Sequence, residues 1–327
     1  MKSKNSEQPL VSVIMPTYNH AKFIGKAVES VLSQTYQNFE LIIINNYSED
    51  DTEKIVASYK DDRIIYLKFR NNGIIAASRN YGIKHSHGEY IAFLDSDDFW
   101  HRQKLEKQLP HFVDEQIVGV ATDAVIKGNE TCRHELFFGK SKLGYKDYVY
   151  NNIFTNNPII TSSLIIRKNI LVSADYFDER KEFQFIEDMD LWLRMARAGK
   201  FRVLGEKLIS YTALNDKFRD RVKVVKRNAN IIKKHFDLGY VGKAEIVERE
   251  SLINYAIGLN LLRLGDSGCR EYFIDCIKKT SILRLKLKAY GGCIISFFPM
   301  FFIRTLLYLY YASRRISSAF GQDRSGY

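Results

Sequence analysis

Four short apolar runs, separated by segments with helical spacing, constrain the fold more than any other feature. Between the first two runs, residues 21–34 carry apolar side chains at helical intervals. Strands that are apolar on both faces and joined by helices predict an α/β fold with a mainly parallel sheet covered on both sides. The runs are "LVSVIMP" (10–16), "FELIIIN" (39–45), "RIIYLKF" (63–69) and "EYIAFLD" (89–95).

Polar residues cluster where these predicted strands end, in "PTYN" (16–19), "NNYS" (45–48) and "DSDD" (95–98). Ligands of such sheets bind beyond the carboxyl ends of the strands, so we expect a ligand site there. No GxGxxG pattern follows the first strand, which argues against an NAD-type dinucleotide site.

Three carboxylates close the fourth run: Asp95, Asp97 and Asp98. If the strand continued, Asp95 and Asp97 would share a face, and two charges about 5 Å apart repel by about 3 kcal/mol at an effective dielectric near 20. An N-cap for a helix over 99–112 explains only one of them. A calcium loop would need a ligand and a glycine where Phe99 and Trp100 stand. A Mg²⁺ or Mn²⁺ site completed by a substrate diphosphate accounts for all three.

The stretch "EYIAFLDSDD" resembles the DxD region of nucleotide-sugar-dependent glycosyltransferases with the GT-A fold, and of glycosyltransferase family 2 in particular. Residues 11–45 resemble the opening of that family, 77–98 its next block and 176–199 its acceptor-side block. The resemblance covers roughly residues 9–215. It implies a GT-A nucleotide-binding domain over 1–220.

The resemblance also implies a donor site. Asn45 stands where many relatives carry an Asp that accepts a hydrogen bond from uracil, and an Asn carbonyl accepts it without charge assistance. This departure weakens the specificity for UDP, so a UDP-sugar is the expected donor but dTDP or another nucleotide stays open. The implied nucleotide-sugar-binding residues are Pro16, Thr17, Tyr18, Asn45, Arg79 and Asp95, and Asp97 is the implied ligand of a Mn²⁺ or Mg²⁺ cofactor.

The acceptor side is implied by "FIEDMDLWLR", which matches the family's "ED" element. An acceptor hydroxyl must lose its proton during attack, so a carboxylate is needed as general base. Asp188 is the candidate and Asp190 the alternative, although these acids could instead cap the helix that follows. Glu187, Asp190 and Trp192 are possible acceptor-side residues, and Trp192 could instead pack inside the fold.

One base and one metal-bound leaving group predict a single displacement that inverts the anomeric centre, because retention through a covalent intermediate needs a second carboxylate. The chain lacks the QxxRW motif of processive synthases in this family, so we expect transfer of a single sugar. A nucleotidyltransferase of similar fold is the main alternative, but the chain has no basic glycine-rich loop after the first strand.

The C-terminal part is basic and helical. The chain has a net charge of +11, and from Lys200 onward 24 Lys and Arg face 11 Asp and Glu. We predict a helical extension over 221–281. We also predict a membrane-associating segment over 282–327, because residues 289–312 are almost wholly apolar and long enough to cross a bilayer.

Pro299 and Arg304 interrupt that apolar stretch, and basic residues flank both of its sides. An interfacial or re-entrant anchor at the inner leaflet is therefore expected rather than a span, with a buried core helix as the alternative. Scattered cysteines and an N-terminus without a signal-peptide pattern predict a cytoplasmic catalytic domain. The expected acceptor is a lipid-linked oligosaccharide, lipopolysaccharide or capsule precursor. A non-catalytic protein that binds membrane or nucleic acid through the tail is a second alternative, although nucleic acid is not expected as a partner.

Overall fold

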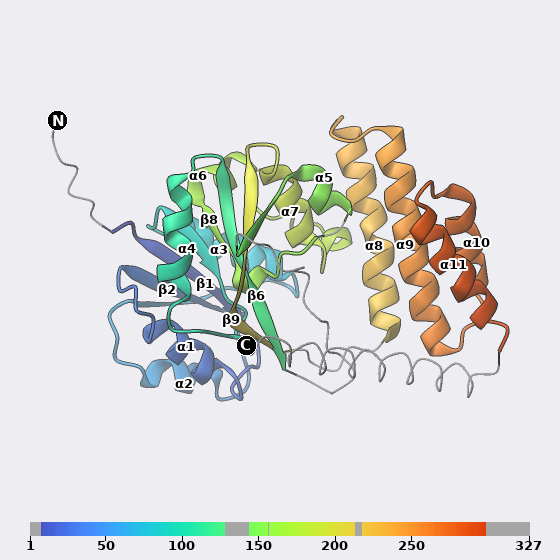
Figure 1. Cartoon of the computed structure of the whole chain (residues 1–327). Coiled ribbons are helices and arrows are strands. Elements are labelled where there is room, and N and C mark those ends of the chain that lie inside the picture. The colour runs from blue at the N-terminus through green and yellow to red at the C-terminus, as the bar shows by residue number, and fades with distance from the viewer. Residues whose placement is uncertain (1–7, 128–143, 156, 213–217, 299–327) are drawn as a thin grey trace, which may run out of the picture. The chain divides into compact units, whose positions relative to one another are not determined.

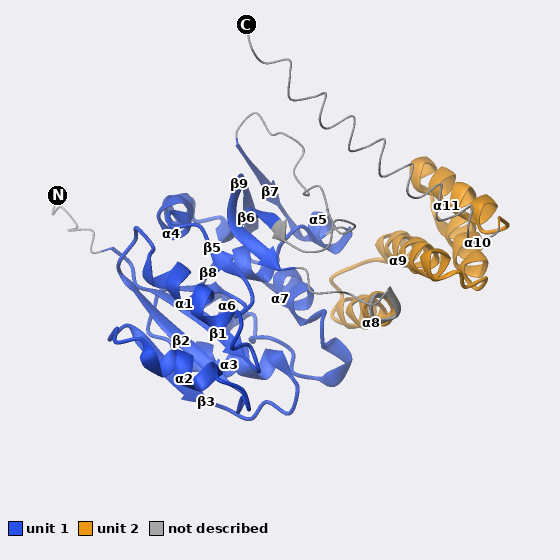
Figure 2. Cartoon of the chain, turned by 90° about the horizontal axis from the view of Figure 1, so that it is seen from below, with its two compact units in different colours: residues 1–215 blue, residues 216–327 orange. Residues whose placement is uncertain are grey.

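The computed structural model describes residues 8–127, 144–155, 157–212 and 218–298, with the side chains of 218–221 left out. The chain divides into two compact units, residues 1–215 and residues 216–327 (Figure 2). The sequence placed the end of the first domain at residue 220. Each unit is described by itself.

The first unit is built on a sheet whose N-terminal strands are parallel, as the sequence predicts. The order of these strands is β3-β2-β1-β4, and each neighbouring pair is parallel. Figure 1 labels β1 and β2, which lie side by side. Every residue of β1 and β2 is buried, as the apolar runs require. The strands are β1 (Val11–Thr17), β2 (Phe39–Asn45), β3 (Ile64–Lys68) and β4 (Tyr90–Phe93).

The sheet then continues beyond β4 in a mixed pattern. Strand β8 is antiparallel to both β4 and β6, whereas β6 and β9 are parallel. Strands β5 and β7 both pair antiparallel with β9. The sheet as a whole is therefore mixed, and only its first half is purely parallel. The further strands are β5 (Phe99–Trp100), β6 (Ile117–Lys127), β7 (Tyr145–Tyr148), β8 (Ile165–Arg167) and β9 (Lys200–Thr212).

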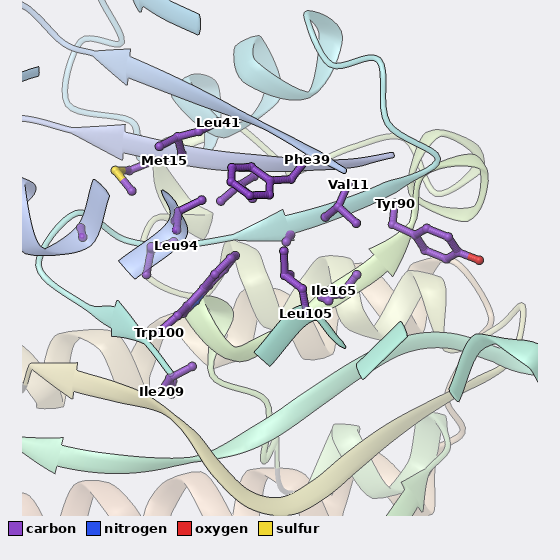
Figure 3. Packing of buried hydrophobic residues seen from close by; sticks show 14 of the residues in the cluster. Val11, Met15, Phe39, Leu41, Tyr90, Leu94, Trp100, Leu105, Ile165 and Ile209 are labelled. Carbon is purple, nitrogen blue, oxygen red and sulfur yellow. The ribbon is translucent and has the colours of Figure 1, made fainter. Parts of the chain in front are cut away.

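Helices cover the two faces of the parallel half. Helix α1 (Ile24–Leu32) shares a buried cluster with Val11, Val13 and Met15 of β1, part of which Figure 3 shows. On the opposite face, helix α3 (Ile75–Lys84) approaches β1 and β2 so closely that a Cβ at Gly82 would lie 2.6 Å from the Ile44 side chain. The doubly covered arrangement predicted from the apolar runs is therefore present.

One predicted helix is wrong at its beginning. The sequence indicated a helix over 99–112, but Phe99 and Trp100 form β5, opposite Ser210 and Ile209 of β9. The helix α4 begins only at Lys104 and ends at Gln108, and a 3₁₀ turn follows over Leu109–Val113. The cause is tertiary: a distant strand supplies the pairing. The remaining helices of this unit are α2 (Thr52–Ser58), α5 (Tyr150–Thr155), α6 (Lys168–Ser173) and α7 (Glu187–Met195).

The second unit is helical where it is described. Its core contains the Phe273 ring, and Gly258 and Gly292 allow their helices to approach that ring, since a Cβ there would lie 2.8 and 2.6 Å from it. Among the described residues, no helix has the length and apolar character needed to cross a bilayer. Most of the predicted membrane segment, from residue 299 on, lies outside the described residues. The helices are α8 (Phe218–Asp237), α9 (Lys243–Leu264), α10 (Cys269–Lys279) and α11 (Leu283–Ile295).

Gly88, which precedes β4, provides a test of this packing. A Cβ there would lie 2.6 Å from the Ser12 backbone nitrogen and 2.7 Å from the Leu10 carbonyl oxygen. We expect Gly88→Ala to lower the free energy of unfolding by about 1–3 kcal/mol, because the backbone cannot yield as a side chain does. Urea unfolding measures the change.

Gly25→Ala is the matched control, since its nearest neighbour, the Tyr59 hydroxyl, is 3.5 Å away. Gly25 lies in α1, where we expect alanine to be neutral or to stabilise by up to about 1 kcal/mol. Equal stability of the two variants would contradict the described contact between Gly88 and β1.

Candidate active site

The acidic stretch after β4 is a turn, not a continued strand. Strand β4 ends at Phe93, and the Asp98 amide donates to the Asp95 carbonyl oxygen (3.0 Å). The shared-face argument for Asp95 and Asp97 is therefore wrong in its geometry. The carboxylates are nevertheless close enough to interact: burial and the charge of Asp95 raise the pKa of Asp97. Burial, Asp95 and Asp97 together raise the pKa of Asp98 to about 8.

Asp98 anchors this turn to the rest of the sheet. It is 2% exposed, and its two oxygens accept hydrogen bonds from the Ser162 hydroxyl (2.6 Å) and the Thr212 amide (2.7 Å). The N-cap of α4 is Gln103, so neither Asp97 nor Asp98 caps that helix. Asp97 is only partly buried. Both carboxylate oxygens of Asp98 are thus engaged in buried hydrogen bonds, and those of Asp97 are not engaged in this way among the described residues.

Arg79 of α3 joins the acidic turn to helix α7. Its guanidinium lies 2.9 Å from Asp95 Oδ1 and 2.9 Å from Glu187 Oε1, and the side chain is only 5% exposed. Burial opposes the charge, but the two carboxylates outweigh it and raise the pKa of Arg79. The arginine thus remains a cation that links the turn after β4 to the beginning of α7.

Asp188 lies beside this bridge, on the first turn of α7. Its Oδ2 accepts a hydrogen bond from the Thr161 hydroxyl (3.1 Å), and its Oδ1 accepts one from the Met189 amide (2.6 Å). Burial first, and then the charge of Glu187, raise the pKa of Asp188 to about 6, although Arg79 acts in the opposite direction. As a residue Asp188 is partly exposed, whereas its neighbours Glu187 and Met189 are buried. A carboxylate with a pKa near neutrality is suited to take a proton.

The other acceptor-side candidates are structural in this fold. Glu187 is 4% exposed and paired with Arg79. Asp190 has no exposed surface, and its Oδ2 accepts two hydrogen bonds from Arg194 (2.8 and 3.0 Å). Trp192 is also fully buried, with its ring against Phe93, Phe177 and Phe201. The hypotheses that Asp190 is the base and that Trp192 borders the acceptor sugar are therefore corrected, because neither side chain has a surface to offer.

The predicted nucleoside pocket is present only in part. Tyr18 is 49% exposed directly after β1, whereas Pro16 is buried within that strand. Asn45 has no exposed surface. Its carbonyl oxygen accepts from the Ser48 amide (2.9 Å) and hydroxyl (2.7 Å), and its amide donates to the Tyr66 hydroxyl (2.6 Å). The interpretation that Asn45 reads the base is wrong, because both ends of its amide are used within the fold.

The loops after β1 and β2 brace each other beside Tyr18. The Asn19 amide donates to the Ser48 hydroxyl (2.9 Å), and the Glu49 amide donates to the Asn19 side chain (2.8 Å). Tyr47 takes a left-handed backbone conformation (φ 55°), which is uncommon for a bulky residue and is concentrated at functional sites. Its ring is 48% exposed, and Arg70 lies over it at 5.0 Å.

Three unpaired polar atoms lie on residues of this same region. Among the described residues, Thr17 Oγ1, Arg79 Nε and Glu187 Oε2 are buried and have no hydrogen-bond partner. Buried polar groups are nearly always satisfied in folded proteins, so each such group requires an explanation. A bound ligand that reaches the carboxyl edge of the sheet would supply partners.

Sequence reasoning missed the residues that hold the acids in place. Ser162 donates to Asp98 and accepts from the Asp95 amide (3.1 Å), and its carbonyl accepts from the Trp100 indole (2.8 Å). The Thr161 hydroxyl donates a hydrogen bond to Asp188, and the Thr212 amide donates one to Asp98. His20 lies near enough to lower the pKa of Asp97. The short polar run "TSS" at 161–163 was the only sequence signal, and nothing in it indicates these partners.

The donor set fits a divalent cation that a ligand would complete. Within the described residues, no group of three or more His, Cys, Asp or Glu side chains could hold a metal alone. Mg²⁺ and Mn²⁺, however, are commonly held by one or two carboxylates together with substrate phosphates. Asp97 offers a partly exposed carboxylate whose pKa is raised by burial and by Asp95. A cation at this position would offset that unfavourable charge.

Comparisons with known proteins identify the family of this chain. The Glycosyl transferase family 2 model matches residues 12–174. A glycosyltransferase of Rickettsia typhi, itself uncharacterized, is 33% identical over 63% of this chain, a match that spans 64% of the relative. The Escherichia coli UDP-Glc:alpha-D-GlcNAc-diphosphoundecaprenol beta-1,3-glucosyltransferase WfaP is 35% identical over 58% of this chain and 71% of its own length.

Among solved structures, the mannosyltransferase PcManGT from Pyrobaculum calidifontis, in complex with GDP-Man and Mn²⁺, superposes with a TM-score of 0.59 at 16% identity. The match covers 97% of this chain and 89% of the other. At that identity the likeness concerns the fold, which is of the GT-A type. The fold is that of a GT-A protein, and the chain belongs to glycosyltransferase family 2.

Two neighbouring serines provide a test of the site's support. We expect Ser162→Ala to lower the free energy of unfolding by about 1–3 kcal/mol, because Asp98 and the Asp95 amide lose a buried partner. Urea unfolding with and without Mn²⁺ measures it.

Ser163→Ala is the control. Its hydroxyl donates only to the Ile160 carbonyl oxygen (2.7 Å), at the same turn but away from the acids, and we expect a loss of about 1 kcal/mol or less. An effect of Ser163→Ala as large as that of Ser162→Ala would contradict the anchoring role of Ser162.

Proposed function

We propose that this protein is an inverting, metal-dependent, non-processive glycosyltransferase that moves one hexose or N-acetylhexosamine from a nucleotide-sugar to a hydroxyl of a glycan acceptor. One observation carries the proposal: Arg79 brings the DxD turn and the "ED" helix together, so that a candidate metal ligand and a candidate base border the same region. Membership of glycosyltransferase family 2 supports the same reaction class.

The donor is expected to occupy the carboxyl ends of β1, β2 and β4. Tyr18, half exposed, is the aromatic surface proposed for the base, and the buried Arg79 cation is proposed to favour the negatively charged diphosphate through its charge. A UDP-sugar is the first candidate, and the UDP-Glc in the name of the E. coli relative supports it. Because the Asn45 amide is hydrogen-bonded to Ser48 and Tyr66, other residues would have to recognise the nucleotide base. A dTDP-sugar or another nucleotide-sugar is therefore a further candidate donor.

Asp97 is proposed to hold the divalent cation, Mn²⁺ or Mg²⁺, with Asp95 oriented by Arg79 beside it. When bound, the cation supplies charge neutralisation for the departing diphosphate. Asp95 is also placed to accept a hydrogen bond from the donor, because one of its oxygens is committed to Arg79 and the side chain is 28% exposed.

Asp188 is proposed as the general base. It would accept the proton of the acceptor hydroxyl as that oxygen attacks the anomeric carbon on the face opposite the diphosphate, which inverts the centre. Thr161 holds one of its oxygens, which orients the carboxylate.

The acceptor is proposed to be a glycan on a lipid carrier, as in a lipid-linked oligosaccharide, lipopolysaccharide or capsule precursor, at the cytoplasmic face of the membrane. The diphosphoundecaprenol acceptor in the name of the E. coli relative supports this class. A basic C-terminal segment, residues 282–327, would keep the enzyme peripherally associated with anionic lipid.

The reaction is tested by nucleotide release from a panel of UDP-, dTDP- and GDP-sugars with Mn²⁺ and with Mg²⁺. We expect Asp97→Asn to reduce release by at least about a hundredfold and to raise the Mn²⁺ concentration required, because the charge that binds the cation is lost. Chelation by EDTA should abolish release by the wild type.

Asp114→Asn is the matched control, since Asp114 is a partly exposed acid paired at 3.4 Å with Arg202, and we expect it to be near wild type. Full turnover of Asp97→Asn, or turnover unaffected by EDTA, would refute the metal role.

Variants of Asp188 and Asp190, two of the three acids of α7, distinguish the proposed general base from an acid with a structural role. We expect Asp188→Asn to lower kcat by about 10²–10⁴-fold with little change in stability, because the proton acceptor is lost. Asp190→Asn should instead lower the melting temperature through loss of the Arg194 pair, with kcat within about tenfold. The reverse pattern, measured by steady-state kinetics and thermal unfolding, would assign the base to Asp190.

The pH profile tests the same assignment. The base acts only when it is deprotonated, and the pKa of Asp188 is raised to about 6, so we expect kcat/KM to fall about tenfold per pH unit below pH 6. The Thr161 hydrogen bond lowers this pKa, so Thr161→Val should move the acid limb upward, and Thr161→Ser should restore it. An acid limb that is identical in all three proteins would contradict the role of Thr161.

A further inference from the structure

Helix α11 and the residues after it expose a line of large apolar side chains. Their positions are separated by four, three, four and three residues, which at 3.6 residues per turn places them on one face. The exposed fractions are 70% for Leu283, 61% for Leu287, 48% for Tyr290, 60% for Ile294 and 68% for Phe297. Such a contiguous exposed apolar surface is a signal of interaction.

The opposite face of the helix is fixed in the core of its unit. Leu285 and Ala289 are buried there, and a Cβ at Gly292 would lie 2.6 Å from the Phe273 ring. At the end of the helix, Arg270 donates to the Ser296 carbonyl oxygen (2.9 Å). The rotation of α11 about its own axis is therefore determined, and Leu283, Leu287, Tyr290 and Ile294 point away from the helices that pack against it. The Phe297 ring, at the end of the line, stays 68% exposed with the Arg270 guanidinium 4.1 Å above it.

The charges beside this face are all of one sign. Arg284 borders the line on one side and Lys286 on the other, and the exposed Lys288 lies farther round the helix on the side of Arg284. No Asp or Glu occurs in the sequence from residue 276 to residue 322, a stretch with eight Lys and Arg. A second copy of this face would bring like charges together, whereas an anionic surface complements both its apolar line and its borders.

The length of the helix decides how it meets a membrane. Its 13 residues extend for about 20 Å, well short of the hydrocarbon core of about 30 Å. A helix this short, whose exposed face is apolar with basic borders and whose other face is packed in the core of its unit, is suited to lie along the interface plane.

We propose that the face of α11 formed by Leu283, Leu287, Tyr290, Ile294 and Phe297 is a docking surface for an anionic lipid bilayer. The helix lies parallel to the membrane, its apolar side chains enter the boundary of the acyl chains, and Arg284, Lys286 and Lys288 reach the headgroups. This inference rests on the proposed function in that it names the surface by which the enzyme meets a lipid-linked acceptor.

Tryptophan fluorescence of the full chain tests the docking surface. Trp100 and Trp192 are 4% and 0% exposed, so a new tryptophan on the surface reports its own surroundings. Leu287→Trp and Ile294→Trp place the probe on the face. Val113→Trp, at an 89% exposed position of the first unit, is the matched control. Vesicles of brominated phosphatidylcholine with phosphatidylglycerol are the probe, and vesicles without phosphatidylglycerol the reference.

With the anionic vesicles we expect bromine to quench the fluorescence of the new tryptophan in Leu287→Trp and in Ile294→Trp. The quenching should be weaker with the neutral vesicles. The new tryptophan in Val113→Trp should not be quenched by either kind of vesicle. Each basic residue near an anionic surface contributes about 1 kcal/mol, a factor of about five. Replacing Arg284, Lys286 and Lys288 by Gln should therefore weaken partitioning about a hundredfold. The same change at the exposed residues Lys54, Lys60 and Lys181 of the first unit should leave it near wild type.

The inference would be overturned if the protein bound vesicles while the tryptophans at positions 287 and 294 stayed unquenched. It would also be overturned if the triple Gln variant of the α11 face and the triple Gln variant of the first unit bound vesicles equally well. A third outcome would also overturn it: a wild-type protein that is a dimer and that the double variant Leu287→Ser, Ile294→Ser converts to a monomer. The apolar face would then bind a second copy of the chain and not a membrane. Nucleotide release in solution keeps the two proposals apart. Release without docking rejects only this inference, and docking without release rejects only the proposed reaction.

Discussion

The buried Arg79 guanidinium is the interaction on which the site depends. It is nearly inaccessible to water and pairs with Asp95 on one side and Glu187 on the other. Removing one partner of such a buried pair leaves an uncompensated charge and costs about 3–5 kcal/mol. Through this one side chain, helix α3 sets the distance between the turn after β4 and the start of α7. The candidate metal ligand and the candidate base are therefore parts of one electrostatic unit.

That unit carries more negative than positive charge. Asp95, Glu187 and Asp188 interact with the Arg79 guanidinium, and Asp97 and Asp98 interact with Asp95. The His20 side chain opposes the raised pKa of Asp97. Burial first, and then the neighbouring carboxylates, raise the pKa values of Asp97, Asp98 and Asp188. Hydrogen bonds from Ser162, Thr161 and Thr212 hold these acids in place despite their repulsion. A divalent cation and a donor diphosphate would complete this arrangement, because the cation supplies the missing positive charge.

Local signals were enough for much of this fold. The parallel strands were predictable because burial on both faces leaves continuous apolar runs, and the family resemblance located the DxD turn and the "ED" element. Contacts between distant residues were not predictable. Phe99 and Trp100 form a strand because β9 lies opposite, and Asn45 is consumed by Ser48 and Tyr66. Neither its neighbours in sequence nor its residue type distinguishes Ser162, which supports the acids, from Ser163, which does not.

The central claim is that the acidic turn after β4 holds a cation against the diphosphate of a nucleotide-sugar. Anomalous diffraction at the manganese edge, from crystals grown with MnCl₂ and the nucleoside diphosphate, tests it most directly. The account predicts one strong peak within bonding distance of the Asp97 carboxylate and of the diphosphate oxygens. Bound nucleotide with no manganese peak at Asp97, or a peak held by other residues, would contradict it.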